Sequence, residues 1–189
     1  MFPQSPPLAH AVKQIRGEEK GGKHNMLITE KTCESLNRIL QLLFGGNAEI
    51  DNLCYNLQYM HLNNIASALH EPVAHKMPEL ADEVSDFMDQ LGCRAVRYSI
   101  GDHDAKYESA ADIFSQLAKY FEELRKDIII AIDDADMNDD VEARIWLENF
   151  LVEKVLPLRK QAAEWLDASG KLSDEELNIH IADYTHYLK

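Results

Sequence analysis

The sequence predicts an all-α protein, and the expected architecture is a four-helix bundle with one long crossover connection. Apolar residues recur at helical spacing along every long segment after residue 25, and no stretch alternates as a strand does. The 8 glycines and 6 prolines lie mostly before residue 26 and at joints between these segments. Short joints connect the helices within each pair, and a link of about 15 residues joins the pairs, as in such a bundle.

Capping residues, glycines and prolines set the expected helix boundaries. Gly45-Gly46 is expected to end the first helix and Gly92 the third, while Pro157 should kink the fifth because proline removes a backbone donor. The predicted helices cover 28–44, 47–69, a segment that starts between Pro72 and Pro78 and ends at Leu91, 109–135, 141–168 and 174–187.

Length and composition favour one bundle domain with an extension at each end. The 189 residues suffice for one sizeable domain. We expect a mobile N-terminal arm at 1–25, the bundle at 26–170 and a C-terminal helical extension at 171–189, so that N- and C-terminal helices flank the bundle. No apolar run reaches the roughly 18 residues that a membrane span needs.

The net charge of -14 disfavours binding to nucleic acid or anionic membrane over most of the surface, although it can attract cations. The N-terminal arm has a small positive excess, which leaves DNA binding as an alternative, although salt-dependent phosphate binding usually needs more positive charge. The charged residues of this arm are Lys13, Arg16, Lys20 and Lys23 against Glu18 and Glu19.

The three cysteines, Cys33, Cys54 and Cys93, lie far apart and form no Cys-x-x-Cys motif. Their odd number argues against a disulfide framework. We therefore expect reduced cysteines and a cytoplasmic protein.

One stripe of the third predicted helix carries side chains that bind metals. His75, Glu79, Asp82 and Asp86 fall within about 60° of each other at 100° per residue. The apolar residues of the same helix centre on the opposite side, so the stripe points out of its own bundle. It is therefore either a solvated face or half of a metal site that a second subunit completes, because carboxylates and imidazole can share a divalent cation.

A metal site inside the bundle has less support. Such a site needs carboxylates on the inward faces of several helices, often with Glu-x-x-His. The two long C-terminal helices contain no Glu-x-x-His, and only Glu148 lies in an apolar stripe, where a buried ion pair is the plainer interpretation. His61 falls in the centre of an apolar face, as a core histidine does. His70 lies beside Glu71 at a helix end, where a capping role competes with metal ligation.

Three segments of the chain are similar to parts of one known family. They are the His-bearing YMHLNN, the helix SALHEPVAHKMPELADEVSDFMDQLG and the helix pair KYFEELRKDIIIAIDDADMNDDVEARIWLENFLVEKVLPLRKQAAEWLDA. In that order, they resemble the end of the first helix, the second helix and the last two helices of the bundle in the Dps-like miniferritins. The resemblance covers roughly residues 28–168 and implies a ferritin-like fold.

The resemblance also implies a function. Dps-like proteins form dodecameric shells that oxidise ferrous iron, usually with hydrogen peroxide, and store the ferric product, which protects against oxidative stress. Their ferroxidase site lies between two subunits. The matching histidines here are His61 and His70, and the matching carboxylates are Asp82 and Asp86 when counted back from Gly92.

Two departures from the family pattern leave alternatives open. Counting forward from His70 places Ser85 and Asp89 at the carboxylate positions instead, and the segment between His61 and His70 lacks the family's Gly-Pro turn. The site could hold manganese or zinc in place of iron. The chain could also be a ferritin-like scaffold or interaction protein that has lost the ferroxidase site.

Overall fold

The computed structural model describes residues 26–188, and all regular elements within them are helices. The predictions for the arm at 1–25 and for an N-terminal flanking helix lie outside these residues. Among the described helices, none combines the length and hydrophobicity that a membrane crossing requires. The elements are α1 (Glu30–Tyr59), α2 (Asn63–Leu69), η2 (His70–Ala74), α3 (Lys76–Gln90), α4 (Ala110–Met137), α5 (Val141–Phe150), η3 (Leu151–Val155), α6 (Leu156–Ser169), α7 (Asp174–His180) and η4 (Ile181–Tyr184).

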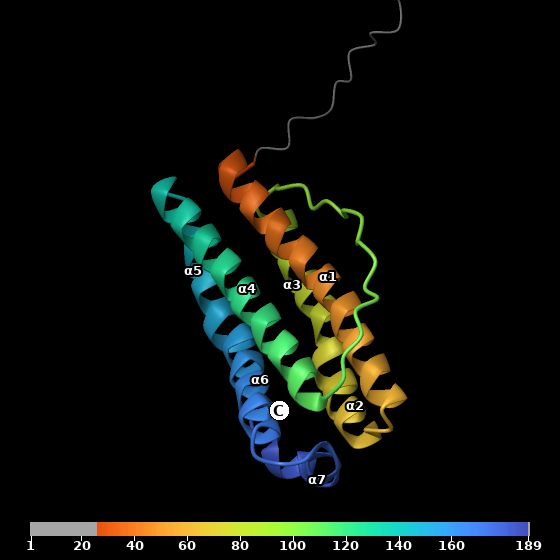
Figure 1. Cartoon of the computed structure of the whole chain (residues 1–189). Coiled ribbons are helices and arrows are strands. Elements are labelled where there is room, and N and C mark those ends of the chain that lie inside the picture. Colours follow the sequence, from red (N-terminus) through yellow and green to blue (C-terminus); the bar gives the residue numbers. More distant parts are fainter. Residues whose placement is uncertain (1–25, 189) are drawn as a thin grey trace, which may run out of the picture.

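Four long rods form the bundle, and two of them are composite. α1 is the first rod, α2–η2–α3 the second, α4 the third and α5–η3–α6 the fourth. α1 packs on α3 and α4, and α4 packs on α5 and α6. Figure 1 shows the single long crossover between α3 and α4 running along α1. The prediction of an all-α four-helix bundle with one long crossover is confirmed.

The predicted break at Gly45-Gly46 is wrong, because α1 continues through both glycines. The reason is a close tertiary contact. A Cβ atom on Gly46 would lie 2.0 Å from the hydroxyl oxygen of Tyr120 on α4, whereas a Cβ on Gly45 would meet nothing within 4 Å. Gly46 therefore lets two long helices approach each other, and the chain reverses later, at Met60–Leu62.

Both composite rods contain a π-helical turn beside a proline. Pro72 lies within η2, and Pro157 follows η3 as one of the first residues of α6. Since proline has no N–H group, it cannot continue the α-helical ladder, and a wider turn accommodates it. The expected disturbance at Pro157 is thus present, as a π turn within an otherwise continuous rod.

Residues after the bundle cover one of its ends and bond to helix N-termini, whose first amides lack partners within their own helices. The Asn178 side chain accepts hydrogen bonds from the amides of Asn64 and Ile65 in α2, at 3.0 and 3.2 Å. Asp174 accepts one from the Ala110 amide at the start of α4, at 3.1 Å. The C-terminal segment therefore stabilises the first turns of two bundle helices.

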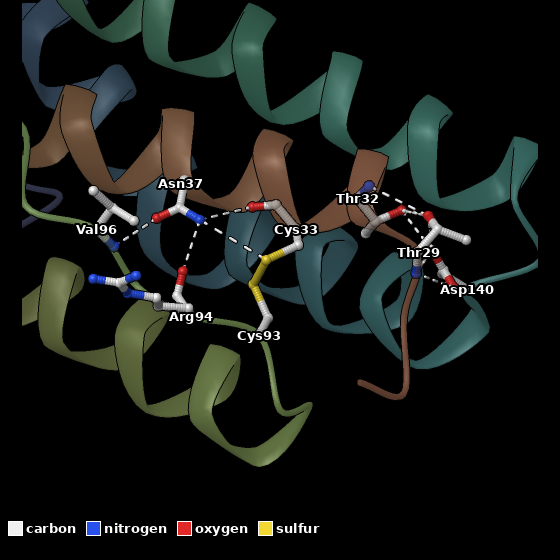
Figure 2. Close-up of a disulfide and its surroundings, with 8 residues drawn as sticks. All are labelled: Thr29, Thr32, Cys33, Asn37, Cys93, Arg94, Val96 and Asp140. Carbon is white, nitrogen blue, oxygen red and sulfur yellow. Dashed lines mark hydrogen bonds between the residues drawn. A yellow bond between two sulfur atoms is a disulfide. The ribbon is translucent and has the colours of Figure 1, made fainter. Parts of the chain in front are cut away.

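At the opposite end, Asp140 joins the start of α1 to the joint before α5 (Figure 2). Its carboxylate accepts hydrogen bonds from the hydroxyls of Thr29 and Thr32, at 2.8 and 2.5 Å, and from the Thr29 amide. Burial alone would raise the pKa of Asp140, but these hydrogen bonds lower it below its ordinary value of 3.8. Asp140 is therefore a buried anion that fixes the two hairpins of the bundle to each other.

The prediction that the cysteines form no disulfide is wrong. Cys33 and Cys93 are bonded, with their Cα atoms 5.8 Å apart, although 60 positions separate them in the sequence. Only Cys54 is a free thiol, and it is buried. Cysteine number and spacing could not reveal this pair, because tertiary packing alone brings the end of α3 beside the start of α1.

Candidate metal centre

The interior of the bundle does not offer a metal site within the described residues. Its buried side chains are apolar apart from five polar ones, of which Asp140 is the only carboxylate. Asp140 lies at the bundle end and is occupied by Thr29 and Thr32. Glu148, expected in a buried ion pair, does pair with Arg144 at 2.9 Å, but its side chain is 45% exposed. The residues present therefore do not fit the carboxylate-rich site of a metal-binding bundle.

A group of metal-binding side chains lies instead on the outer surface of the second rod. His70, Glu71 and His75 place one potential ligand atom each within 4.8 Å of one another. The Glu71 carboxylate lies 3.9 Å from His70 Nδ1 and 3.4 Å from His75 Nδ1. Two imidazoles and a carboxylate are a donor set that suits divalent transition metals.

The π turn creates this arrangement. His70 and His75 are five residues apart. In a regular α-helix, each residue turns by about 100°, so these two side chains would point about 140° away from each other. In η2 the His75 amide donates to the His70 carbonyl at 3.2 Å, and the imidazole rings meet with their centroids 4.4 Å apart. The local change of helix type thus converts two separated histidines into neighbours.

Asp51 on α1 approaches the same group from the neighbouring rod. Its Oδ1 atom lies 3.7 Å from Nε2 of His70. This oxygen is buried and accepts no hydrogen bond within the described structure. A buried carboxylate oxygen without a hydrogen bond is costly. Asp51 faces Nε2 of His70 whereas Glu71 faces Nδ1, so Asp51 lies on the other side of the ring and can orient the imidazole. Asp51 also contributes, after burial, to raising the pKa of the Cys54 thiol to about 12.

The carboxylates of the predicted stripe lie on an exposed face, separate from the group of three. Asp82, Asp86 and Glu79 are exposed, whereas Leu80 and Val84 on the same helix are buried. Glu79 bonds to Lys76 at 2.7 Å, and this hydrogen bond with the lysine charge lowers the pKa of Glu79. The stripe therefore points away from its own bundle, as the periodicity indicates, and its link to a metal stays a prediction.

The core position expected for His61 is wrong. α1 ends at Tyr59, and His61 occupies the joint to α2 with a φ of 63° and an exposed side chain. Within one chain, the structure thus brings together His70 and His75 of the predicted ligands. His61, Glu79, Asp82 and Asp86 are not members of a group of three potential ligands among the described residues.

Sequence reasoning missed Glu71 and Asp51 as partners of the two histidines. Glu71 and His75 are four residues apart, and this spacing is a signal that could have been found. Asp51 has no such signal, because its proximity to His70 depends on how α1 packs against the second rod.

Solved structures that resemble the chain are ferritins. The open pore ferritin from the hyperthermophilic archaeon Archaeoglobus fulgidus superimposes with a TM-score of 0.77 at 15% sequence identity, covering 86% of this chain and 99% of that one. The chain has a ferritin-like fold. A humanized archaeal ferritin gives a TM-score of 0.77 at 16% identity, covering 84% of this chain and 97% of that one. A closed form of the Archaeoglobus fulgidus ferritin, engineered by mutagenesis, gives 0.76 at 15% identity, with 86% and 98% covered.

No protein-family model matches the chain, and no curated protein does either. At these identities, the likeness to ferritins establishes the fold alone, since one fold hosts many functions. The chemistry of the ferritin-like chain therefore has to be argued from its own side chains.

Proposed function

We propose that this chain is a ferritin-like iron protein of the Dps type, which assembles into a homo-oligomeric shell, oxidises ferrous iron with hydrogen peroxide and retains the ferric product. The observation that carries this proposal is the group His70–Glu71–His75, whose His70 ring also contacts the buried Asp51 oxygen through Nε2. Ferrous iron is the substrate, and each ion gives up one electron while peroxide takes two. Removing peroxide in this way would protect the cell against oxidative stress.

The side chains have distinct roles in capturing the substrate ion. The His70 and His75 rings offer nitrogen donors, and the carboxylate of Glu71 offsets the charge of the cation. Glu71 is close to both imidazoles and mostly exposed, so it can exchange these contacts for a metal ion with little rearrangement. Asp51 comes from another helix and contacts Nε2 of His70, the ring nitrogen that does not face Glu71, so its role is to orient the imidazole.

A second subunit would complete the site. Asp82 and Asp86 lie exposed on α3, which belongs to the second rod, and His61 lies exposed just before that rod begins. A neighbouring copy of the chain could contribute these side chains to the site. Two tyrosines on α1 follow Asp51 at helical spacing, Tyr55 and Tyr59, and their side chains are 60% and 87% exposed. Aromatic side chains of this kind are enriched in protein interfaces. A dodecamer is the assembly that the resemblance to the Dps type implies.

The second candidate is a ferritin-like scaffold without redox chemistry. The observation that favours it is the apolar bundle interior, which lacks the ligands of an intrabundle site among the described residues. Under this alternative, the surface histidines and carboxylates would be a solvated face.

The test is to add ferrous iron and peroxide to the metal-free full-length protein, follow ferric absorbance, and measure iron in the size-separated oligomer. Three double variants would be compared with the natural chain. The first is His70→Ala with His75→Ala, the second Asp82→Ala with Asp86→Ala, and the control His180→Ala with Asp183→Ala. The control removes an exposed histidine–carboxylate pair, 3.3 Å apart, on another helix.

We expect oxidation well above the buffer rate, with iron retained in a large assembly. The first two variants should oxidise iron at the buffer rate and keep their helical content, while the control stays unchanged. An unchanged rate in the His70 and His75 variant would exclude this group. Oxidation no faster than buffer by the natural chain, with a shell still present, would establish the scaffold alternative.

A further inference from the structure

The crossover between α3 and α4 is an extended segment that is fixed at its two ends. Residues 93–107 contain no regular element, and Figure 1 shows them following α1 along most of its length. Such a segment depends on a few discrete anchors for its position. Its anchors differ in chemistry, and one of them is covalent.

The covalent anchor is the Cys33–Cys93 disulfide at the end of α3. Gly92 adopts a φ of 69°, a conformation that glycine tolerates best, and the Cys93 amide donates to the Met88 carbonyl at 2.9 Å. This helix cap directs Cys93 toward Cys33 in the first turns of α1, as Figure 2 shows. Residue 93 is therefore held by both the cap and the sulfur bridge.

One turn along α1, Asn37 holds the next part of the crossover. Its buried side chain accepts a hydrogen bond from the Val96 amide at 2.7 Å and donates to the Arg94 carbonyl at 3.0 Å (Figure 2). Asn37 and Cys33 are neighbours on α1, and the side-chain Nδ2 of Asn37 also donates to the Cys33 carbonyl at 3.1 Å. The disulfide and the asparagine therefore form a single anchor at residues 93–96.

The far end is held without a covalent bond, by hydrogen bonds and by Tyr107, which packs against the core. Asn52 and Asn56 both donate to the Ala105 carbonyl, at 3.0 and 3.1 Å, and Asn56 accepts from the Tyr107 amide at 3.2 Å. Between the anchors, residues 98–104 make no hydrogen bond with a helix in the described structure, and several of them cover a groove of about 540 Å³ between α1 and α4. The covering residues are Tyr98, Ser99, Ile100, Gly101 and His103.

We propose that the Cys33–Cys93 disulfide is a reversible redox switch that sets how tightly residues 94–104 are held over the groove between α1 and α4. Cys33 is the more accessible sulfur, because Cys93 is 4% exposed and Cys33 is only half-buried. A glutathione thiolate attacks Cys33 Sγ, and Cys93 leaves as the thiolate. A second glutathione then resolves the mixed disulfide, giving two protein thiols and one oxidised glutathione.

Re-formation needs a two-electron oxidant. Oxidised glutathione can reverse the exchange, and hydrogen peroxide can convert the two thiols to the disulfide and two waters. Cys54 does not compete, since it is fully buried and its thiol pKa is raised to about 12 by burial and by Asp51.

The test uses the full-length protein in buffers with different ratios of reduced to oxidised glutathione. Alkylation after denaturation and mass spectrometry give the redox state of each cysteine. Amide hydrogen exchange at seconds to minutes then compares the reduced and oxidised folded protein. We expect reduction without loss of helical content, and exchange of the Cys93 and Val96 amides that is faster by about tenfold, because these amides make the hydrogen bonds of the anchor, which opens locally.

Two variants separate the switch from a general loss of stability. Cys33→Ser with Cys93→Ser should show the faster exchange at every glutathione ratio, and Cys54→Ala should keep the full redox response. Equal exchange of the Cys93 and Val96 amides in both redox states would overturn the proposal. So would a disulfide that is reduced only after denaturation, or exchange that rises equally along α4.

Discussion

The first helical hairpin, α1 with α2–η2–α3, and the second, α4 with α5–η3–α6, use the same backbone devices with different side chains. Each begins with a long helix, of 30 and 28 residues. Among residues 26–188, two non-glycine residues have a positive φ, and they precede α2 and α5. They are His61 at 63° and Asp139 at 57°. Each returning rod then contains one π turn beside a proline.

The two π turns show what the shared backbone leaves undecided. In η2 the wide turn pairs His70 with His75, and in η3 the same amide-to-carbonyl bond joins Leu156 to Leu151. The turn η2 thus presents two imidazoles, whereas η3 presents two aliphatic side chains. A π turn brings residues five apart together, and their identity alone decides whether the result could bind a metal.

The largest expected effect is on metal affinity, when the histidines of η2 are replaced by the leucines found in η3. His70→Leu with His75→Leu copies the η3 pair into η2 and should weaken binding of cobalt(II) or zinc by a hundredfold or more. Even replacing a residue that only hydrogen-bonds to a metal ligand costs about 10–100-fold in affinity. The fold should persist, because η3 accommodates leucines in an equivalent turn. Calorimetric titration of the metal-free protein measures the change, and unaltered affinity would show that the two turns are equivalent.

Asp140, which ties the joint of the second hairpin to the start of the first, gives the next largest effect. Asp140→Ala should lower the free energy of unfolding by about 2 kcal/mol near neutral pH, because it removes charge-assisted hydrogen bonds to Thr29 and Thr32. The folded-state pKa of Asp140 is lower than its ordinary value of 3.8, so this stabilisation is present above pH 3.8.

The same contribution is lost as the pH falls through the folded-state pKa. Urea unfolding of the natural chain and the Asp140→Ala variant should therefore give curves that converge at acid pH. A difference that stayed constant with pH would mean that the carboxylate charge is irrelevant to the joint.

The two adjacent glycines of the long helix α1 should respond to substitution with opposite changes in stability. Gly46→Ala should destabilise the protein by about 1–3 kcal/mol, the usual cost of overpacking, because its Cβ meets the buried Tyr120. Gly45→Ala is the matched control. Its Cβ meets nothing, so it should stabilise α1 by up to about 1 kcal/mol through helix propensity. Thermal unfolding of both variants measures the opposite signs, and equal effects would contradict the close approach of α1 and α4.

The smallest expected effect on stability comes from the two joint residues with a left-handed backbone conformation, His61 and Asp139. His61→Gly should stabilise the protein by about 1 kcal/mol, because glycine adopts a positive φ without steric cost. Asp139→Gly should gain less, since aspartate tolerates this conformation better than most residues. If His61 is also a metal ligand from a neighbouring subunit, its replacement alone should slow iron oxidation. Equal rates in the two variants would remove His61 from the proposed site.

Helical periodicity and the positions of glycine and proline were enough to predict much of the fold. The crossover length, the Gly92 stop and the apolar stripe of α3 are all encoded within short segments, and the structure confirms them. Gly45-Gly46 misled the boundary prediction because glycine has two roles. It can end a helix, or it can remove a Cβ where another helix comes close, and only the position of Tyr120 distinguishes them.

The candidate metal site was predictable in part. The sequence by itself placed His75, Glu79, Asp82 and Asp86 on one stripe of a helix, because helical geometry is local, and it placed His70 at a helix end. Tertiary structure decided the rest. A π turn placed the two imidazoles together, α1 supplied Asp51, and the meeting of two chain segments made Cys33 and Cys93 partners. Contacts between distant residues depend on how whole helices pack, and no short stretch of sequence contains that information.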